Sequence, residues 1–364
     1  MADWVELAGF EKDPYEKVDP FRIDEKYLSW NRPDLKQVRV QVDKFLEDVY
    51  QKKRVGLKLW GPYGSGKTWL CRVLELELKK KDPDVLFIYT KVPKAEPTFQ
   101  VVYRIAIEHV LRDYFGIIKD KVQKKTSGVD RKSWQQIIGE NELAIVLAHY
   151  HTDTNRALAN KWLIGDSLSA SELRELNVVS SVDSDFDRQE MLKTIVRVAG
   201  PIFSTVVLVV DELENARKLA GALGDIMREM LDGFSERFAL VASFTAQRAE
   251  EWYDLGYSEG LNRRIDYAVG LEALDRERVS DFLRAHNALY RKEDAKTKDQ
   301  LYPFTEEGAI QVLDSTFEGN RYPGYYLSNC RDIAQIAMEK KVVADKNFVL
   351  KNEDKMRFRQ VYAE

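Results

Sequence analysis

A glycine-rich octapeptide constrains this chain more than any other stretch. Residues 61–68 read Gly-Pro-Tyr-Gly-Ser-Gly-Lys-Thr, which matches the pattern G-x-x-x-x-G-K-[ST]. The residues before it, 55–60, alternate as a short strand does, and those after it, 69–76, carry apolar side chains at helical spacing. A loop of this composition between a strand and a helix predicts a site for the phosphates of a nucleotide.

Each residue type in the loop has a chemical role in that prediction. The glycines let backbone N–H groups turn inward around a phosphate, and the following helix adds the positive end of its dipole. Lys67 is expected to reach the β- and γ-phosphates of ATP and to assist catalysis, and the Thr68 hydroxyl to ligate Mg²⁺. The predicted nucleotide-binding residues are Gly61, Pro62, Tyr63, Gly64, Ser65, Gly66, Lys67, Thr68 and Trp69.

A pair of acids follows a later apolar run. Residues 205–210 read Thr-Val-Val-Leu-Val-Val, as expected of a strand buried on both faces, and Asp211 and Glu212 come directly after them. Parallel strands present their carboxyl ends to ligands at one edge of the sheet. Asp211 is therefore predicted to hold Mg²⁺ together with Thr68, and Glu212 to polarise the water that attacks the γ-phosphate.

Further strand-like runs complete a predicted parallel sheet covered by helices on both faces, an α/β sandwich. They lie at 84–89, 238–245 and 267–271. The second ends in hydroxyl side chains, so Ser243 or Thr245 is a candidate sensor of the γ-phosphate; the alternative is a local backbone cap. Arg263 and Arg264 precede the last strand, where an arginine either enters a neighbouring subunit's site or forms an ordinary surface ion pair.

The spacing of the strands predicts how the chain is divided. About 115 residues separate the strands at 84–89 and 205–210, far more than a parallel crossover needs, which indicates a helical insertion at 118–196. Within it we expect helices at 134–149, 155–163, 169–176 and 187–199. The division is an N-terminal cover segment 1–33, a core 34–271, a helical lid 272–341 and a charged tail 342–364. The cover segment either helps form an adenine pocket or simply shields the core.

A cluster of basic residues opens the insertion. Six lysines and arginines oppose two aspartates between residues 119 and 132, a local charge of +4, around Thr126-Ser127-Gly128. We interpret this basic loop as a contact for the DNA backbone or, alternatively, as a solvated charged loop. The basic residues are Lys119, Lys121, Lys124, Lys125, Arg131 and Lys132.

Composition narrows the class of protein further. The net charge of −4 argues against binding nucleic acid through bulk charge. Two widely separated cysteines, Cys71 and Cys330, give no disulfide framework and fit a reducing compartment. We find no apolar run of eighteen residues and no secretion signal at the N-terminus, so we expect a cytoplasmic protein without a membrane partner.

With these motifs in place, the chain resembles the AAA+ and STAND-type P-loop ATPases, in particular the origin-recognition branch. The likeness rests on residues 61–68, 207–212 and 319–327 and covers 30–117 and 200–340. It implies an AAA+ fold, a sensor at Ser243 or Thr245, an arginine finger at Arg263 or Arg264, and a lid sensor at Arg321. In the insertion, residues 157–165 and 171–176 resemble ATP-binding proteins of phage-defence systems such as BREX.

Three departures from the family pattern accompany the resemblance. Gly324 stands where many relatives carry a lid arginine, so Arg321 or Arg331 would have to replace it. Thr90 and Lys91 follow the second strand in place of the usual asparagine. The chain after the lid is too short for the DNA-binding winged-helix domain of origin-recognition proteins.

The sequence therefore predicts an ATPase that binds Mg²⁺ and ATP and acts as an oligomerising, DNA-associated switch. The main alternative is a STAND-like signalling or defence switch that binds a protein partner through the helical insertion. A third possibility is a chain that keeps ATP permanently as a structural element.

Overall fold

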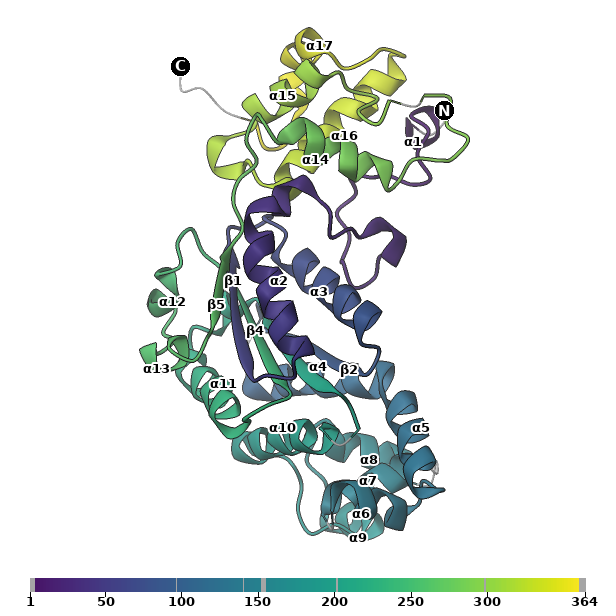
Figure 1. The fold of residues 1–364 in the computed structure, drawn as a ribbon, viewed down its shortest axis with the longest axis vertical. Helices are drawn as coiled ribbons and strands as arrows, with labels where there is room; N and C mark the ends of the chain where they lie inside the picture. The colour runs from purple at the N-terminus through teal and green to yellow at the C-terminus, as the bar shows by residue number, and fades with distance from the viewer. Residues whose placement is uncertain are drawn as a thin grey trace.

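A five-stranded parallel sheet lies at the centre of the computed structural model, which describes residues 4–95, 97–139, 141–151, 155–200, 202–297 and 299–359. The strand order is β2-β3-β4-β1-β5 (Figure 1). This arrangement confirms the predicted α/β sandwich, and all the predicted strand segments are found. The strands are β1 (Val55–Gly61), β2 (Val85–Lys91), β3 (Thr205–Asp211), β4 (Phe238–Thr245) and β5 (Tyr267–Gly270).

The sheet is buried because helices cover both of its faces, as the continuous apolar runs predicted. Every residue of β3 is buried. Helices α2 (Lys36–Tyr50) and α3 (Lys67–Lys81) pack on one face, and α4 (Phe99–Asp113), α10 (Asp185–Ala199) and α11 (Ala220–Gly233) pack on the other. Two short helices, α12 (Glu251–Asp254) and α13 (Glu259–Asn262), connect β4 to β5.

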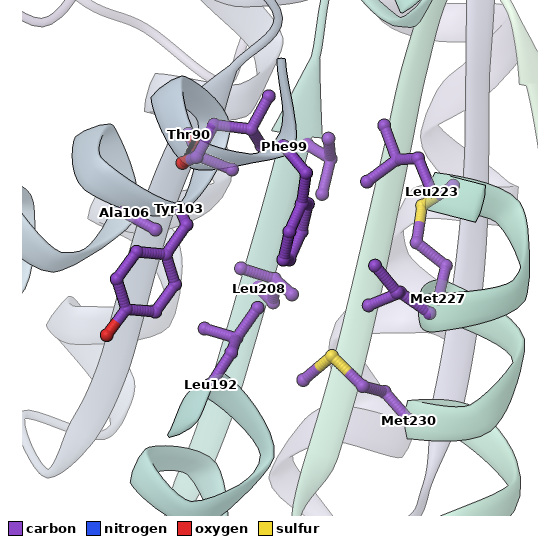
Figure 2. Close-up of a pocket in the computed structure, with 12 residues that line it drawn as sticks. Thr90, Phe99, Tyr103, Ala106, Leu192, Leu208, Leu223, Met227 and Met230 are labelled. Carbon is purple, nitrogen blue, oxygen red and sulfur yellow. Dashed lines mark hydrogen bonds between the residues drawn. The ribbon is translucent and has the colours of Figure 1, made fainter. Parts of the chain in front are cut away.

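A small apolar cavity remains under the second layer of helices. Figure 2 shows side chains of α4, α10 and α11 pointing toward one another over β3, among them Phe99, Leu192 and Met230. The cavity has a volume of about 10 Å³, which is room for about one water molecule, and its lining is almost entirely apolar. We therefore regard it as a packing gap in the core and look for the functional site elsewhere.

The long segment between β2 and β3 is helical, as predicted, but it differs from the expected helices in two places. The expected helix 134–149 is two helices that break at Gly139, whose φ of +82° no helix can accommodate. The last helix, α10, packs beside α4 against the sheet and so belongs to the core layers. The helices before it are α5 (Phe115–Thr126), α6 (Arg131–Ile138), α7 (Glu142–His151), α8 (Arg156–Leu163) and α9 (Ala170–Leu176).

The predicted basic loop is also mostly helical. Lys119 to Lys125 lie in α5, and Arg131 and Lys132 form the first turn of α6, so only residues 127–130 connect two helices. Asp130 caps α6 by accepting a hydrogen bond from the Ser133 N–H. The basic residues are therefore held on a helical hairpin, and the expected loop is confined to the turn at 127–130.

The C-terminal part forms a helical unit above the sheet (Figure 1). It contains α14 (Val279–Ala288), α15 (Glu306–Asp314), α16 (Pro323–Glu339) and α17 (Lys346–Asn352). Val349 and Met356 are buried in its apolar core, because α17 packs against α15. The described part of the expected charged tail is thus packed into the lid. The sequence did not predict this packing, because charged residues surround the two apolar positions.

The N-terminal segment joins both parts of the molecule. Helix α1 (Trp4–Leu7) packs against α16, and Tyr15 is buried among lid residues. Residues 19–27 bridge the two parts: Arg72 of α3 in the core pairs with Glu25 at 3.0 Å, whereas the Tyr27 ring stacks on Tyr290 of the lid. We call residues 19–27 the arm. The N-terminal segment therefore does more than shield the core, because its first residues pack into the lid.

The remaining short elements are 3₁₀ turns at Glu25–Tyr27, Pro33–Leu35, Leu213–Ala216, Glu318–Asn320 and Glu353–Lys355. Among the helices of the described residues, none is long and apolar enough to cross a membrane.

Candidate functional site

The glycine-rich loop connects the end of β1 to the start of α3 at the carboxyl edge of the sheet. Gly64 and Gly66 have φ values of +81° and +100°, which are left-handed conformations that glycine adopts without strain. Gly66 stands at the N-cap of α3, and a Cβ atom there would meet nothing within 4 Å. Space for a ligand therefore remains beside Gly66 at the N-cap of α3, as a phosphate site at a helix N-terminus requires.

Lys67 is the charged residue of this loop. Its side chain is 8% exposed, and its Nζ donates to the carbonyls of Gly61 at 2.7 Å and Pro62 at 3.0 Å. Burial lowers the pKa of Lys67, while the charge of nearby Glu214 opposes this shift. The Ser65 hydroxyl is also buried and has no hydrogen-bond partner among the described residues. A buried cation beside an unpartnered hydroxyl and open backbone fits a phosphate group.

The second motif meets the first at Thr68. The Thr68 hydroxyl donates to Asp211 Oδ2 at 2.7 Å, although the two residues are 143 positions apart in sequence. Asp211 is 1% exposed and ends β3. A hydroxyl and a carboxylate are the hard oxygen ligands that Mg²⁺ prefers, so these two residues fit the predicted metal.

Glu212, the proposed base, has an unusual backbone. Its φ of +57° is left-handed, a conformation that is rare for a residue other than glycine and is found most often at functional sites. Burial, and then the charge of Asp211, raises the pKa of Glu212, while Lys91 acts in the opposite direction. A raised pKa favours a carboxylate that accepts a proton.

The polar partner of Glu212 is Asn215, a residue that the sequence analysis did not predict. Asn215 donates from Nδ2 to Glu212 Oε2 at 3.2 Å and to the Val92 carbonyl at 2.9 Å. Thr90 is 2% exposed, and its hydroxyl donates to the carbonyl of Val102 and not to Glu212. Asn215, which follows β3, thus contacts Glu212 in place of the asparagine that is absent after β2. The sequence pattern Asp-Glu-x-x-Asn at residues 211–215 could have predicted this contact.

The two hydroxyl candidates on β4 have different environments. Ser243 is fully buried inside the strand, and its Oγ has no partner among the described residues. Thr245 lies opposite Gly61 in the strand register and donates from its N–H and its hydroxyl to Glu214, at 2.9 and 2.5 Å. Thr245 is therefore the residue next to the phosphate loop. Glu214 was also missed, although a third acid three residues after Asp211 signalled it.

The two candidate finger arginines lie at the opposite edge of the sheet. The Arg264 carbonyl accepts a hydrogen bond from Arg54, which precedes β1, whereas the phosphate loop follows β1. Arg264 pairs with Asp232, and Arg263 pairs with Glu259 while its side chain is 72% exposed. Neither can reach the loop of its own chain, so a role at such a site requires a second subunit.

The lid arginines also have partners away from the loop. Arg321 donates to the carbonyls of Thr316 and Asp314, each at 3.4 Å, near the end of α15. Arg331 pairs with Asp13 at 2.6 Å. In this structure the proposed lid sensor therefore faces the lid itself.

The lid nevertheless contacts the phosphate loop directly, through Gly324. The Gly324 N–H donates to the Gly64 carbonyl at 2.9 Å. A Cβ atom on Gly324 would lie 3.1 Å from the Gly64 oxygen and 3.2 Å from its Cα atom. An arginine at position 324 would thus crowd the docked loop, which explains why glycine stands there. Beside this contact lies an open cleft of about 300 Å³ lined by Pro62, Tyr63, Thr245, Ala246, Gln247, Glu251, Gly319, Asn320 and Tyr325.

Replacing Gly324 by alanine should loosen this contact. We expect Gly324→Ala to lower the free energy of unfolding by about 1–3 kcal/mol, the usual cost of overpacking, because backbone atoms of Gly64 cannot easily move aside. Gly221→Ala is the matched control, since a Cβ on this helical glycine meets nothing within 4 Å. Thermal unfolding and hydrogen exchange at residues 62–65 measure the effect. Equal stability and exchange in both variants would contradict the docking role.

Comparison with known proteins shows the fold. No protein-family model matches the chain, and no curated protein matches it by sequence. The Aeropyrum pernix ORC2 protein in its ADPNP-ADP complexes is similar in structure, with a TM-score of 0.53 and 9% identity over 94% of this chain and 73% of that chain. Cdc6p from Pyrobaculum aerophilum gives a TM-score of 0.47 and 15% identity over 93% and 73%. The likeness to ORC2 agrees with the predicted fold, a parallel α/β sandwich.

Proposed function

We propose that this chain binds ATP with Mg²⁺ and hydrolyses it. The observation that carries the proposal is the 2.7 Å hydrogen bond from Thr68 to Asp211, which joins the phosphate loop to the acidic strand end. Lys67 and the backbone of the loop would hold the phosphates, Thr68 and Asp211 would hold the metal, and Glu212 would accept the proton of the attacking water. The metal would supply charge neutralisation at the phosphates. The ORC2 protein that shares this fold is described in complexes with ADPNP and ADP, which supports the choice of nucleotide.

We further propose that nucleotide binding drives assembly on DNA. Arg263 has one acidic partner in the structure, an exposed ion pair with Glu259, which contributes little free energy and is easily exchanged. It can therefore serve a neighbouring subunit. The α5–α6 hairpin presents the exposed residues Lys124, Arg131 and Lys132 for phosphate contacts, whereas Lys121 is tied to Asp84 at 2.6 Å.

The DNA proposal predicts a specific salt dependence. Replacing Lys124, Arg131 and Lys132 by glutamate should reduce the affinity for duplex DNA about equally for all sequences, and should flatten the plot of log K against log salt by about one unit for each lost phosphate contact. Fluorescence anisotropy with ATP and Mg²⁺ measures this. Replacing Lys341, Lys346 and Lys351 by glutamate is the control, because it changes the charge by the same amount on the lid, away from the hairpin. An unchanged slope in the triple variant would exclude the hairpin as the DNA contact.

A partner protein is the second candidate for the insertion. Val179 and Phe186, which lie between α9 and the first turn of α10, are 89% and 70% exposed, so they offer apolar surface that a partner could bury. Molecular mass in solution, measured without nucleotide, with ADP, and with ATP and Mg²⁺, separates the two candidates. Assembly with ATP that Arg263→Ala abolishes supports the oligomeric ATPase. A monomer in every state, with no binding to DNA at low salt, favours the partner-gated switch.

A further inference from the structure

The metal-binding carboxylate has a third donor that no motif predicted. Asp211 accepts hydrogen bonds from the Thr68 hydroxyl at 2.7 Å, the Tyr89 hydroxyl at 3.1 Å and the Glu212 N–H at 2.8 Å. Thr68 and Tyr89 share one oxygen, Oδ2, and the backbone N–H takes the other. Both oxygens of this buried carboxylate are thus fixed by the protein.

Tyr89 stands in β2, the strand that pairs with β3, two positions before the residue opposite Asp211. Its ring packs against Phe21 of the arm, with ring centroids 3.9 Å apart. The arm is fastened at this place by Arg72, whose guanidinium lies 5.8 Å from the Phe21 ring and pairs with Glu25. A continuous set of contacts therefore runs from the surface of α3 through Phe21 and Tyr89 to Asp211.

The two hydroxyl donors to Asp211 have different roles in the proposed site. Thr68 would itself be a metal ligand, because its oxygen has a lone pair for the metal while its proton can still donate to Asp211. Tyr89 is the side-chain donor that is not a proposed ligand, so it can hold the carboxylate in position. A phenol is an O–H donor that is protonated at neutral pH, so Tyr89 can keep donating this hydrogen bond. Such partners of a ligand orient it for the metal.

We propose that Tyr89 is a positioning residue of the Mg²⁺ site and that the N-terminal arm acts on this site through Phe21. The inference rests on the proposed function, because it names how the same nucleotide site gains its metal. It also gives the arm a role beyond covering the core: displacement of the arm would weaken metal binding without touching the phosphate loop.

The test separates metal binding from nucleotide binding. Binding of a methylanthraniloyl ATP analogue is measured by fluorescence in EDTA and then at increasing Mg²⁺, and Mn²⁺ binding to the complex is measured by electron paramagnetic resonance. Tyr89→Phe should raise the Mg²⁺ and Mn²⁺ concentrations at half saturation about tenfold, the lower end of what loss of such a partner costs. Affinity for the analogue in EDTA should stay unchanged. Phe21→Ala should act in the same direction, and Phe21→Tyr, which keeps the ring contact, should behave as the wild type.

Tyr50→Phe is the matched control, because the Tyr50 hydroxyl donates to the Glu77 carbonyl at 2.9 Å, far from Asp211. Equal metal affinity in Tyr89→Phe and wild type would overturn the inference and leave the proposed function intact. An equal loss in Tyr89→Phe and Tyr50→Phe would also overturn it, because the effect would then be general destabilisation. A wild type that binds no analogue in either condition would overturn the proposed function itself.

Discussion

Replacing Lys67 by methionine should strongly weaken nucleotide binding while leaving the stability of the unliganded protein close to that of the wild type. The lysine is expected to form charge-assisted hydrogen bonds with the β- and γ-phosphates. If two such bonds contribute about 1.5 kcal/mol each, their loss of about 3 kcal/mol weakens ATP binding roughly 100-fold. The same substitution also removes a charge that is costly to bury. We therefore expect the affinity for ATP to fall while the free energy of unfolding of the unliganded protein changes little.

The stability argument follows from the partners of Lys67. Its Nζ contacts the carbonyls of Gly61 and Pro62, but each carbonyl also accepts a backbone N–H, from Ala246 and Ser65 respectively. No salt bridge to Lys67 is found among the described residues. Methionine has a similar length and no desolvation cost, so we expect the free energy of unfolding to change by less than about 1 kcal/mol.

Lys58 provides a matched control for this prediction. It is 7% exposed in β1, close to the 8% of Lys67, and burial lowers its pKa as well, but its Nζ donates to Asn262 at 2.7 Å. Lys58→Met should keep ATP affinity. Calorimetric titration gives the affinities, and thermal unfolding with and without ATP and Mg²⁺ gives the stabilities. If Lys67→Met retained wild-type affinity, the octapeptide would not be the nucleotide site.

The positions of the strands along the chain could be predicted from the sequence because their signals are local. The apolar runs before Thr90 and Asp211 are long enough to mark buried strands, and the glycine-lysine-threonine pattern fixes the turn into α3. The meeting of Thr68 with Asp211 then follows from the rule that parallel strands end at one edge. The two motifs are therefore sufficient to predict the contact between Thr68 and Asp211.

Contacts between distant segments that carry no motif could not be predicted in this way. Tyr89 reads as an ordinary strand residue, and only the pairing of β2 with β3 brings its hydroxyl to Asp211. Gly324 reads as a missing arginine until α16 is seen docked on Gly64. Likewise, Val349 lies among charged residues, and its burial depends on where α17 packs. Tertiary packing decides these positions, and it leaves little trace in local composition.

Replacing Glu212 by glutamine should stop hydrolysis and preserve ATP binding. A positioned general base contributes about 10²–10⁴-fold to a reaction, so we expect the rate of ATP hydrolysis to fall at least 100-fold. The glutamine is isosteric, and its carbonyl oxygen can still accept the hydrogen bond from Asn215, so the left-handed backbone at this position should persist. Affinity for ATP with Mg²⁺ should therefore stay within about threefold, a difference of less than 1 kcal/mol.

The pH profile gives this prediction a second readout. Because burial and Asp211 raise the pKa of Glu212, the base is lost by protonation at a higher pH than for an ordinary glutamate, and hydrolysis by the wild type should decline as the pH falls through that raised value. The residual rate of Glu212→Gln should lack this decline. Glu214→Gln is the control, since both oxygens of Glu214 are occupied by Thr245 and are poorly placed to accept a proton from water. A larger loss of hydrolysis in Glu214→Gln than in Glu212→Gln would reverse the assignment of the two acids and make Glu214 the base.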